Sequence, residues 1–221
     1  MVLYKDEAIK KNQLLHLMSH ADPDAYRDVV LLKNKINVLN NEYRLALIDI
    51  ALSSLRQLSK KQYPLFKSNL NALIKMDKKI SLSEWVIEKI VIRHLDRVFE
   101  PKRSKKEKLT LKNTQNAYAV LLSLLVYSSK KNDITPDNAF NKAKQQLDSL
   151  DIQLLDKRSL NLKSLNQALD QLILLKPLQK PTLLKACAAC ITADNNISHT
   201  EIELFRAIAD TLDCPMPPLV V

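Results

Sequence analysis

The sequence of 221 residues contains no glycine at all. Average usage of about 7% would supply roughly 15 glycines in a chain of this length. Tight β-hairpins depend on glycine because their turns need positive φ angles, whereas helices need it chiefly at their C-caps, where asparagine can replace it. Four asparagines are available for such caps: Asn37, Asn40, Asn41 and Asn195. The absence of glycine therefore excludes a multi-strand β protein and predicts an all-α fold.

Cysteines, aromatic residues and long apolar runs are also scarce. Three cysteines, an odd number, argue against a disulfide framework and for a reducing compartment. The longest strongly apolar run, residues 118–127, is about half the length that a bilayer-spanning helix needs. The charged first twenty residues lack the apolar core of a signal peptide. We therefore expect a soluble protein, and its hydrophobic content of 46% is enough for a real core.

Positive charge is in excess, with a formal net charge of +10. The densest basic run contains Lys102, Arg103, Lys105, Lys106 and Lys108. These side chains could contact phosphates of nucleic acid or of anionic lipids, or they could form a solvated linker. An aromatic content of only 5% supplies few platforms for stacking bases. We therefore favour a linker at 101–109 between a first half, 1–100, and a second half, 110–221, and regard nucleic acid as an improbable partner.

One short phrase occurs once in each half. Residues 77–84 read Asp-Lys-Lys-Ile-Ser-Leu-Ser-Glu, and residues 194–201 read Asp-Asn-Asn-Ile-Ser-His-Thr-Glu. Apolar residues at helical spacing precede and follow both copies. The Ser-x-x-Glu within each copy matches the capping box that begins a helix. A repeated helix–loop–helix corner predicts a chain built from two related halves.

The two corners place Asp77, Glu84, Asp194 and Glu201 at helix junctions. Carboxylate oxygens in such a place suit a divalent cation, the one cofactor that the sequence suggests. An EF-hand is excluded because its earlier ligand positions and its turn glycine are missing. The alternative is structural: the glutamates complete capping boxes, and the aspartates accept backbone amides of the turn.

Apolar residues follow the 3.6-residue period of a helix through most of the chain. Two broad stripes, at 47–58 and 65–74, are the clearest examples. The pattern predicts about ten helices, near 3–20, 23–38, 42–58, 60–76, 82–98, 110–129, 136–149, 164–175, 181–192 and 199–213.

Several start signals support these boundaries. Asp22-Pro23 and Thr135-Pro136 pair an N-cap with proline at the first helical position, and further capping boxes are expected from Ser59 and Ser164. The proline-rich residues 214–218 cannot continue a helix.

No catalytic motif is complete. His16 and His20 share a helix face as in H-E-x-x-H, but Leu17 occupies the position of the required glutamate. Cys187 and Cys190 match C-x-x-C, but a redox motif of this kind needs a βαβ context. We expect ordinary surface histidines, small buried cysteines and a chain that is not an enzyme.

The corner sequences resemble those of the tellurite-resistance, or TerB-like, helical fold, whose repeats carry an A-D-G-x-I-s-x-x-E phrase. Residues 193–201 match it with asparagine in place of glycine, and residues 75–84 match it more loosely. Nearly the whole chain, above all residues 43–85 and 183–218, is similar to the region that follows the protease domain in bacterial membrane zinc metallopeptidases of the HtpX/CAAX-protease type.

This resemblance implies two TerB-like helical bundles that form a C-terminal accessory region. The parent's zinc motif and membrane helices would lie upstream, on a protein attached to the inner membrane with this region on the cytoplasmic side. The function expected first is a non-catalytic interaction or regulatory module whose partner is its own protease domain or a substrate. Two alternatives stay open: a divalent-cation-binding stress-response domain, and a basic binder of nucleic acid or anionic lipid.

Overall fold

The computed structural model describes residues 3, 6–77, 79–101, 107–128, 134–147 and 150–219. These residues form ten α-helices and no β-strand, and one isolated bridge pairs Leu109 with Leu175. The all-α prediction is therefore confirmed for the described part of the chain. No helix in that part is long and apolar enough to cross a membrane.

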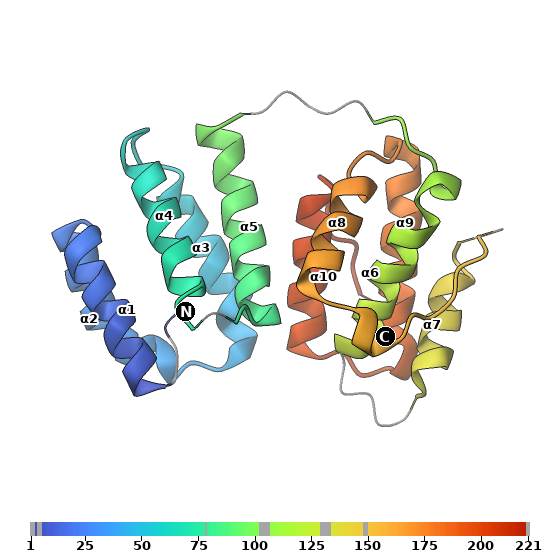
Figure 1. The fold of residues 1–221 in the computed structure, drawn as a ribbon, viewed down its shortest axis with the longest axis horizontal. Coiled ribbons are helices and arrows are strands. Elements are labelled where there is room, and N and C mark those ends of the chain that lie inside the picture. The colour runs from blue at the N-terminus through green and yellow to red at the C-terminus, as the bar shows by residue number, and fades with distance from the viewer. Residues whose placement is uncertain are drawn as a thin grey trace. The chain divides into compact units, whose positions relative to one another are not determined.

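The chain divides into two compact units, residues 1–102 and 103–221 (Figure 1). The first unit consists of α1 (Glu7–His20), α2 (Pro23–Asn37), α3 (Arg44–Leu55), α4 (Gln62–Ile74) and α5 (Leu82–Phe99). The second consists of α6 (Gln115–Ser128), α7 (Pro136–Lys144), α8 (Leu162–Leu172), α9 (Lys180–Ile191) and α10 (His199–Thr211).

Local capping chemistry sets where several of these helices begin. The Asp6 side chain accepts the amides of Ala8 and Ile9, so α1 begins at Glu7 and not at residue 3 as the periodicity suggested. The expected capping box from Ser164 was wrong. Asn161 caps α8 instead and Ser164 is the third helical residue, because asparagine is a strong N-cap that starts the helix earlier.

The largest other differences from the predicted boundaries are at the start of α6 and the end of α7. A 3₁₀ turn at Leu111–Thr114 precedes α6, and α7 ends at Lys144, whereas one helix was expected over 110–129 and another over 136–149. Helix ends commonly tighten into 3₁₀ turns, which periodicity does not register.

Left-handed backbone is rare in this chain without glycine. Among the described residues only Asn195 (φ 57°) and Asp213 (φ 60°) have positive φ. Asn195 follows the short 3₁₀ turn after α9, and Asp213 follows the last turn of α10, where the amide of Cys214 donates to Ala209 (3.0 Å). Asparagine and aspartate tolerate this conformation better than other side chains, so of the four asparagines considered only Asn195 takes the role of a missing glycine.

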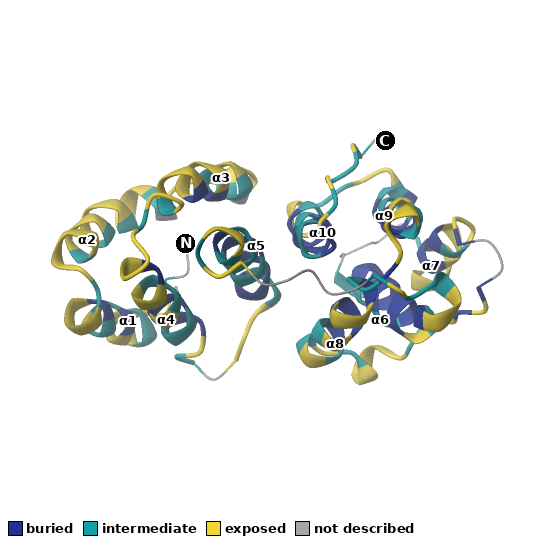
Figure 2. Cartoon of the chain, turned by 90° about the horizontal axis from the view of Figure 1, so that it is seen from above, coloured by how far each residue is buried: buried dark blue, intermediate teal, exposed yellow. Residues whose placement is uncertain are grey.

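In the first unit the five helices surround a common interior. α1 packs against α2 and α4, while α5 packs against α3 and α4, and Figure 2 shows them as a ring seen nearly end-on. The buried residues, among them Tyr63, Trp85, Ile90 and Leu95, lie mainly on α4 and α5. Helix α2 has no buried residue among those described.

In the second unit α6 is the central helix. It packs against α7, α8, α9 and α10, and α7 also packs closely on α9. Tyr118, Leu121, Phe140 and Phe205 are almost completely buried in this core. Figure 2 shows that buried residues are concentrated on α6, α7 and α9.

Candidate functional site

The first acidic corner joins α4 to α5 and is a complete capping box. The amide and the hydroxyl of Ser81 donate to one oxygen of Glu84 (2.9 and 2.7 Å), and the amide of Glu84 donates to Ser81 Oγ (3.3 Å). Upstream, Asp77 Oδ1 accepts the amide of Lys79 (2.9 Å). Glu84 is buried, so its carboxylate is part of the helix start.

The second corner joins α9 to α10 with the same geometry. Ser198 donates its amide and its hydroxyl to Glu201 (2.9 and 2.8 Å) and accepts the Glu201 amide (3.3 Å), while Asp194 Oδ1 accepts the amide of Asn196 (3.2 Å). The phrase therefore stands between the fourth and fifth helices of each unit. Lys78, which corresponds to Asn195, lies outside the described residues.

The corner carboxylates are engaged in hydrogen bonds of their own turns. Across the described residues, no group of three or more His, Cys, Asp or Glu side chains is arranged to hold a metal ion. Each unit contributes one corner with two of the four acidic residues Asp77, Glu84, Asp194 and Glu201, and all four accept hydrogen bonds within their own turns. The divalent-cation hypothesis stays a prediction.

The two histidines of α1 connect helices of the first unit. Their rings stack with centroids 4.3 Å apart, and His16 Nε2 is hydrogen-bonded to Asn69 Oδ1 of α4 (3.1 Å). Beside them, the Gln13 amide donates to the backbone oxygen of Leu73 (3.1 Å). These bonds position α1 on α4, which makes the histidines structural groups.

The C-x-x-C cysteines are buried in the second unit, as expected. Cys187 and Cys190 lie on α9 with almost no exposed surface. Burial raises the pKa of Cys187 well above its ordinary value, and the neighbouring Cys190 adds to the shift. A thiol in this environment stays protonated and unreactive.

A charged cluster joins α4 to α5. The Tyr63 hydroxyl donates to Asp96, and Lys67 donates to Asp96 (2.6 Å) and Glu100 (2.9 Å). Burial, together with the bond to Asp96, raises the pKa of Tyr63. Burial opposes the charge on Lys67, but its bonds to Asp96 and Glu100 raise the pKa of the lysine. Tyr63 therefore keeps its proton and Lys67 its charge at neutral pH, and the cluster links α4 to the end of α5.

Most of the predicted anion-contact residues fall outside the described part of the chain: Lys102, Arg103, Lys105 and Lys106. Lys108 is exposed. The neighbouring Glu107 accepts a hydrogen bond from Lys180, which is only 3% exposed, and Leu109 exchanges backbone hydrogen bonds with residues 174 and 176. The end of the expected linker is therefore fixed to the second unit.

One feature that the motifs did not indicate is an apolar cavity of about 530 Å³ in the first unit. All five helices contribute to it, with Leu17 from α1, Ile36 from α2, Leu47 from α3, Phe66 from α4 and Val91 from α5. Arg44 and Ser54 are its only polar lining residues. We call it the apolar cavity.

The apolar cavity opens to solvent along α2 and α3. Leu32, which lines it, is 46% exposed, and the adjacent Leu31 and Val30 are also exposed. On α3, the lining residue Ala51 is exposed and Ile50 beside it is 68% exposed. Nearly all of the exposed large hydrophobic residues in the described chain belong to the first unit, and such concentrations mark interaction sites.

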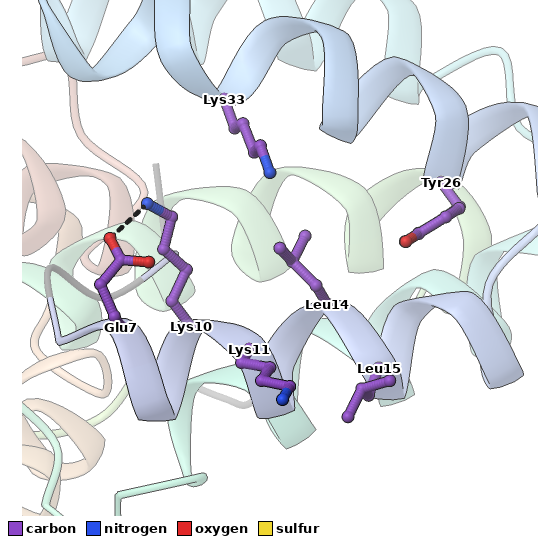
Figure 3. A pocket seen from close by; sticks show the side chains of 7 residues that line it. All are labelled: Glu7, Lys10, Lys11, Leu14, Leu15, Tyr26 and Lys33. Atoms are coloured by element: carbon purple, nitrogen blue, oxygen red, sulfur yellow. Dashed lines mark hydrogen bonds and ion pairs between the residues drawn. The ribbon is translucent and has the colours of Figure 1, made fainter.

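A second pocket, the basic pocket, lies between α1 and α2 and has a volume of about 480 Å³. In Figure 3, Lys33 and Tyr26 point from α2 toward α1, and Leu14 points from α1 into the space between them. Lys10 is paired with Glu7 at 3.0 Å. Lys11 also lines the pocket, so the lining carries more positive than negative charge.

The sequence contained partial signals for both features. The stripes at 47–58 and 65–74 supply much of the cavity wall, including Leu47, Leu55, Phe66 and Leu70. Their periodicity predicted a buried face but not what would cover it. The basic pocket had no signal, because Lys11 and Lys33 lie far apart in the sequence and line one pocket only through the α1–α2 hairpin.

Comparison of the chain with protein-family models, with curated proteins and with solved structures gives no match. The class of protein is therefore defined by the fold and the site: an all-α chain of two units, the first of which has an open apolar cavity.

Proposed function

We propose that this chain is a non-catalytic interaction or regulatory module that binds a protein partner through the apolar cavity of its first unit. The observation that carries the proposal is the open cavity itself, with exposed apolar side chains along its mouth. A concave, predominantly apolar site with few polar groups suits binding. The resemblance of residues 43–85 and 183–218 to a metallopeptidase accessory region supports a protease domain of that type as the partner, on the cytoplasmic side of the inner membrane.

The test is co-purification of the full chain with the zinc protease domain from the same organism. We expect a complex with micromolar or tighter affinity. Leu47→Asp places a charge in the cavity wall and should abolish the complex, because an unpaired charge cannot be desolvated there at low cost. Leu178→Asp is the matched control, since Leu178 is 91% exposed in the second unit, and it should leave binding unchanged.

Circular dichroism and denaturant unfolding of both variants show whether the fold is kept. Absence of a complex at high micromolar concentration, or equal binding by the two variants, would overturn the proposal.

A further inference from the structure

The lining of the apolar cavity favours an apolar occupant. An engineered apolar cavity of about 150 Å³ stays free of water and takes up benzene, whereas the cavity of the first unit measures about 530 Å³. Its walls offer almost no hydrogen bonds to water, because fourteen of the sixteen lining residues are apolar. A partner that fills the cavity would therefore insert several hydrophobic side chains.

The walls suit a helix better than an extended segment. Along α2 the lining residues Val29, Leu32 and Ile36 are spaced by three and four, as are Ile48, Ala51 and Leu55 on α3. Ridges and grooves at this spacing accept the side chains of another helix. A partner that binds as an added β-strand would need a free sheet edge, and the described residues contain no strand.

The basic pocket adjoins the apolar cavity along α2. Tyr26 and Lys33 of the pocket alternate with Val29 and Ile36 of the cavity at intervals of three and four residues, and such residues share one face of a helix. An occupant of the cavity therefore passes within reach of Lys33.

The lysines of the basic pocket differ in their partners. Lys10 is neutralised by Glu7, whereas Lys11 and Lys33 form no ion pair with any described residue. Two such cations in a pocket that adjoins the apolar cavity favour a partner with negative charge on the flank of its hydrophobic face. The chain's formal net charge of +10 acts in the same direction.

We infer that the partner segment is an amphipathic α-helix with an acidic polar face, an inference that rests on the proposed function. Its hydrophobic side chains fill the apolar cavity, and its carboxylates pair with Lys11 and Lys33. The cavity gives affinity, and the two lysines select acidic helices over basic ones.

The experiment uses the full chain and two synthetic peptides of about eighteen residues, long enough for several helical turns. They share one leucine-rich apolar face and differ only in the polar face, which carries glutamate and glutamine in the first and lysine and glutamine in the second. Fluorescence anisotropy at low salt gives both affinities. We expect the acidic peptide to bind about tenfold more tightly, because two partly exposed ion pairs form, and the ratio should shrink as salt screens them.

Charge reversal tests the two lysines directly. Lys11→Glu/Lys33→Glu should invert the preference, so that the basic peptide binds more tightly. Lys163→Glu/Lys176→Glu is the matched control, because it changes the net charge equally at two exposed residues of the second unit. The control should keep the wild-type preference.

The outcomes separate this inference from the proposed function. Equal binding of both peptides, or the same change of preference in the control variant, overturns the acidic helix while leaving an apolar docking site. Binding of neither peptide by a chain that still forms the protease complex also overturns it. Stoichiometric binding of dodecanoate without peptide binding assigns the cavity to a small amphiphile and overturns the inference. If neither the peptides nor the protease domain bind, the proposed function fails as well.

Discussion

In the first unit α1 packs against α2 and α4, and α4 packs against α5. The corresponding helices of the second unit form the same pairs: α6 packs against α7 and α9, and α9 packs against α10. The second unit adds close packing of α6 on α8 and of α7 on α9. The corresponding helices of the first unit, α1 with α3 and α2 with α4, do not form such close pairs in the described residues, and the apolar cavity lies among them.

This difference shows that five helices with similar pairing can enclose either a closely packed core or a core with an open cavity. Among the residues that the structure describes, the second unit contains more than twice as many buried apolar residues as the first. Buried apolar area is the main source of stability, so the second unit should be the stable scaffold and the first the unit that binds. Ligand-binding regions are generally drawn from the less stable parts of a structure.

The largest expected effect comes from the same substitution in both units. Phe205→Ala removes a completely buried ring from α10 and should lower the free energy of unfolding by about 3–5 kcal/mol. Phe66→Ala, at the half-buried cavity wall of α4, should cost roughly half of that or less, because few atoms pack on its open side. Denaturant unfolding, with hydrogen exchange to assign losses to each unit, measures both. Equal losses would show that the first unit is as tightly packed as the second.

Enlarging a small side chain should destabilise the second unit and leave the stability of the first unit unchanged or raised. Ala186→Leu on α9, where Ala186 is completely buried, should destabilise by about 1–3 kcal/mol through overpacking. Ala51→Leu places the same group in the apolar cavity and should be neutral or stabilise by up to about 1 kcal/mol. Thermal unfolding of both variants gives the result. A clear loss for Ala51→Leu would contradict the open packing around this wall of the cavity.

The capping boxes should behave alike despite the different cores. Ser81→Ala and Ser198→Ala each remove one N-cap oxygen and should cost about 1 kcal/mol, because the hydrogen-bond lengths of the two boxes agree closely. Ser53→Ala, where the hydroxyl donates to a backbone oxygen within α3, is the control and should change stability by less than about 0.5 kcal/mol. Denaturant unfolding should show equal losses for the two caps; unequal losses would mean that the corners are not equivalent.

The smallest expected difference is in alkaline solution. The folded second unit keeps Cys187 protonated because burial raises the pKa of this thiol above 9.0. The stabilisation that the protonated thiol gives the folded state is therefore complete below pH 9.0, and it is lost as the pH rises toward the pKa of the folded state. In the first unit the corresponding groups are Tyr63 and Lys67, whose pKa values are raised above 10.0 and 10.5. The stability that these two groups contribute is also lost as the pH rises, but the loss begins at a higher pH because their ordinary pKa values are higher than that of the thiol.

Hydrogen exchange at pH 8–10.5 follows each unit separately. We expect the second unit to lose protection first, and Cys187→Ala to delay that loss, since alanine does not titrate. An unchanged pH profile in this variant would remove the thiol from the explanation.

The ten helices and the two corners could be predicted because their causes are local. The 3.6-residue period, the Asp22-Pro23 start and the paired Ser-x-x-Glu boxes act over a few neighbouring residues. The errors also have local causes: Asp6 and Asn161 are stronger start signals than the apolar periodicity that surrounds them. The relation of the halves to TerB-like bundles stays a prediction.

The sequence by itself determined that the chain is helical, where most helices begin, and which residues close the two corners, because a backbone with no glycine and abundant caps has few other choices. Only the tertiary structure decided that the stripes of α3 and α4 surround a cavity while α6 and α9 meet closely packed partners. An apolar stripe records that a helix face avoids water. It does not record whether the covering surface belongs to the same unit or to a partner.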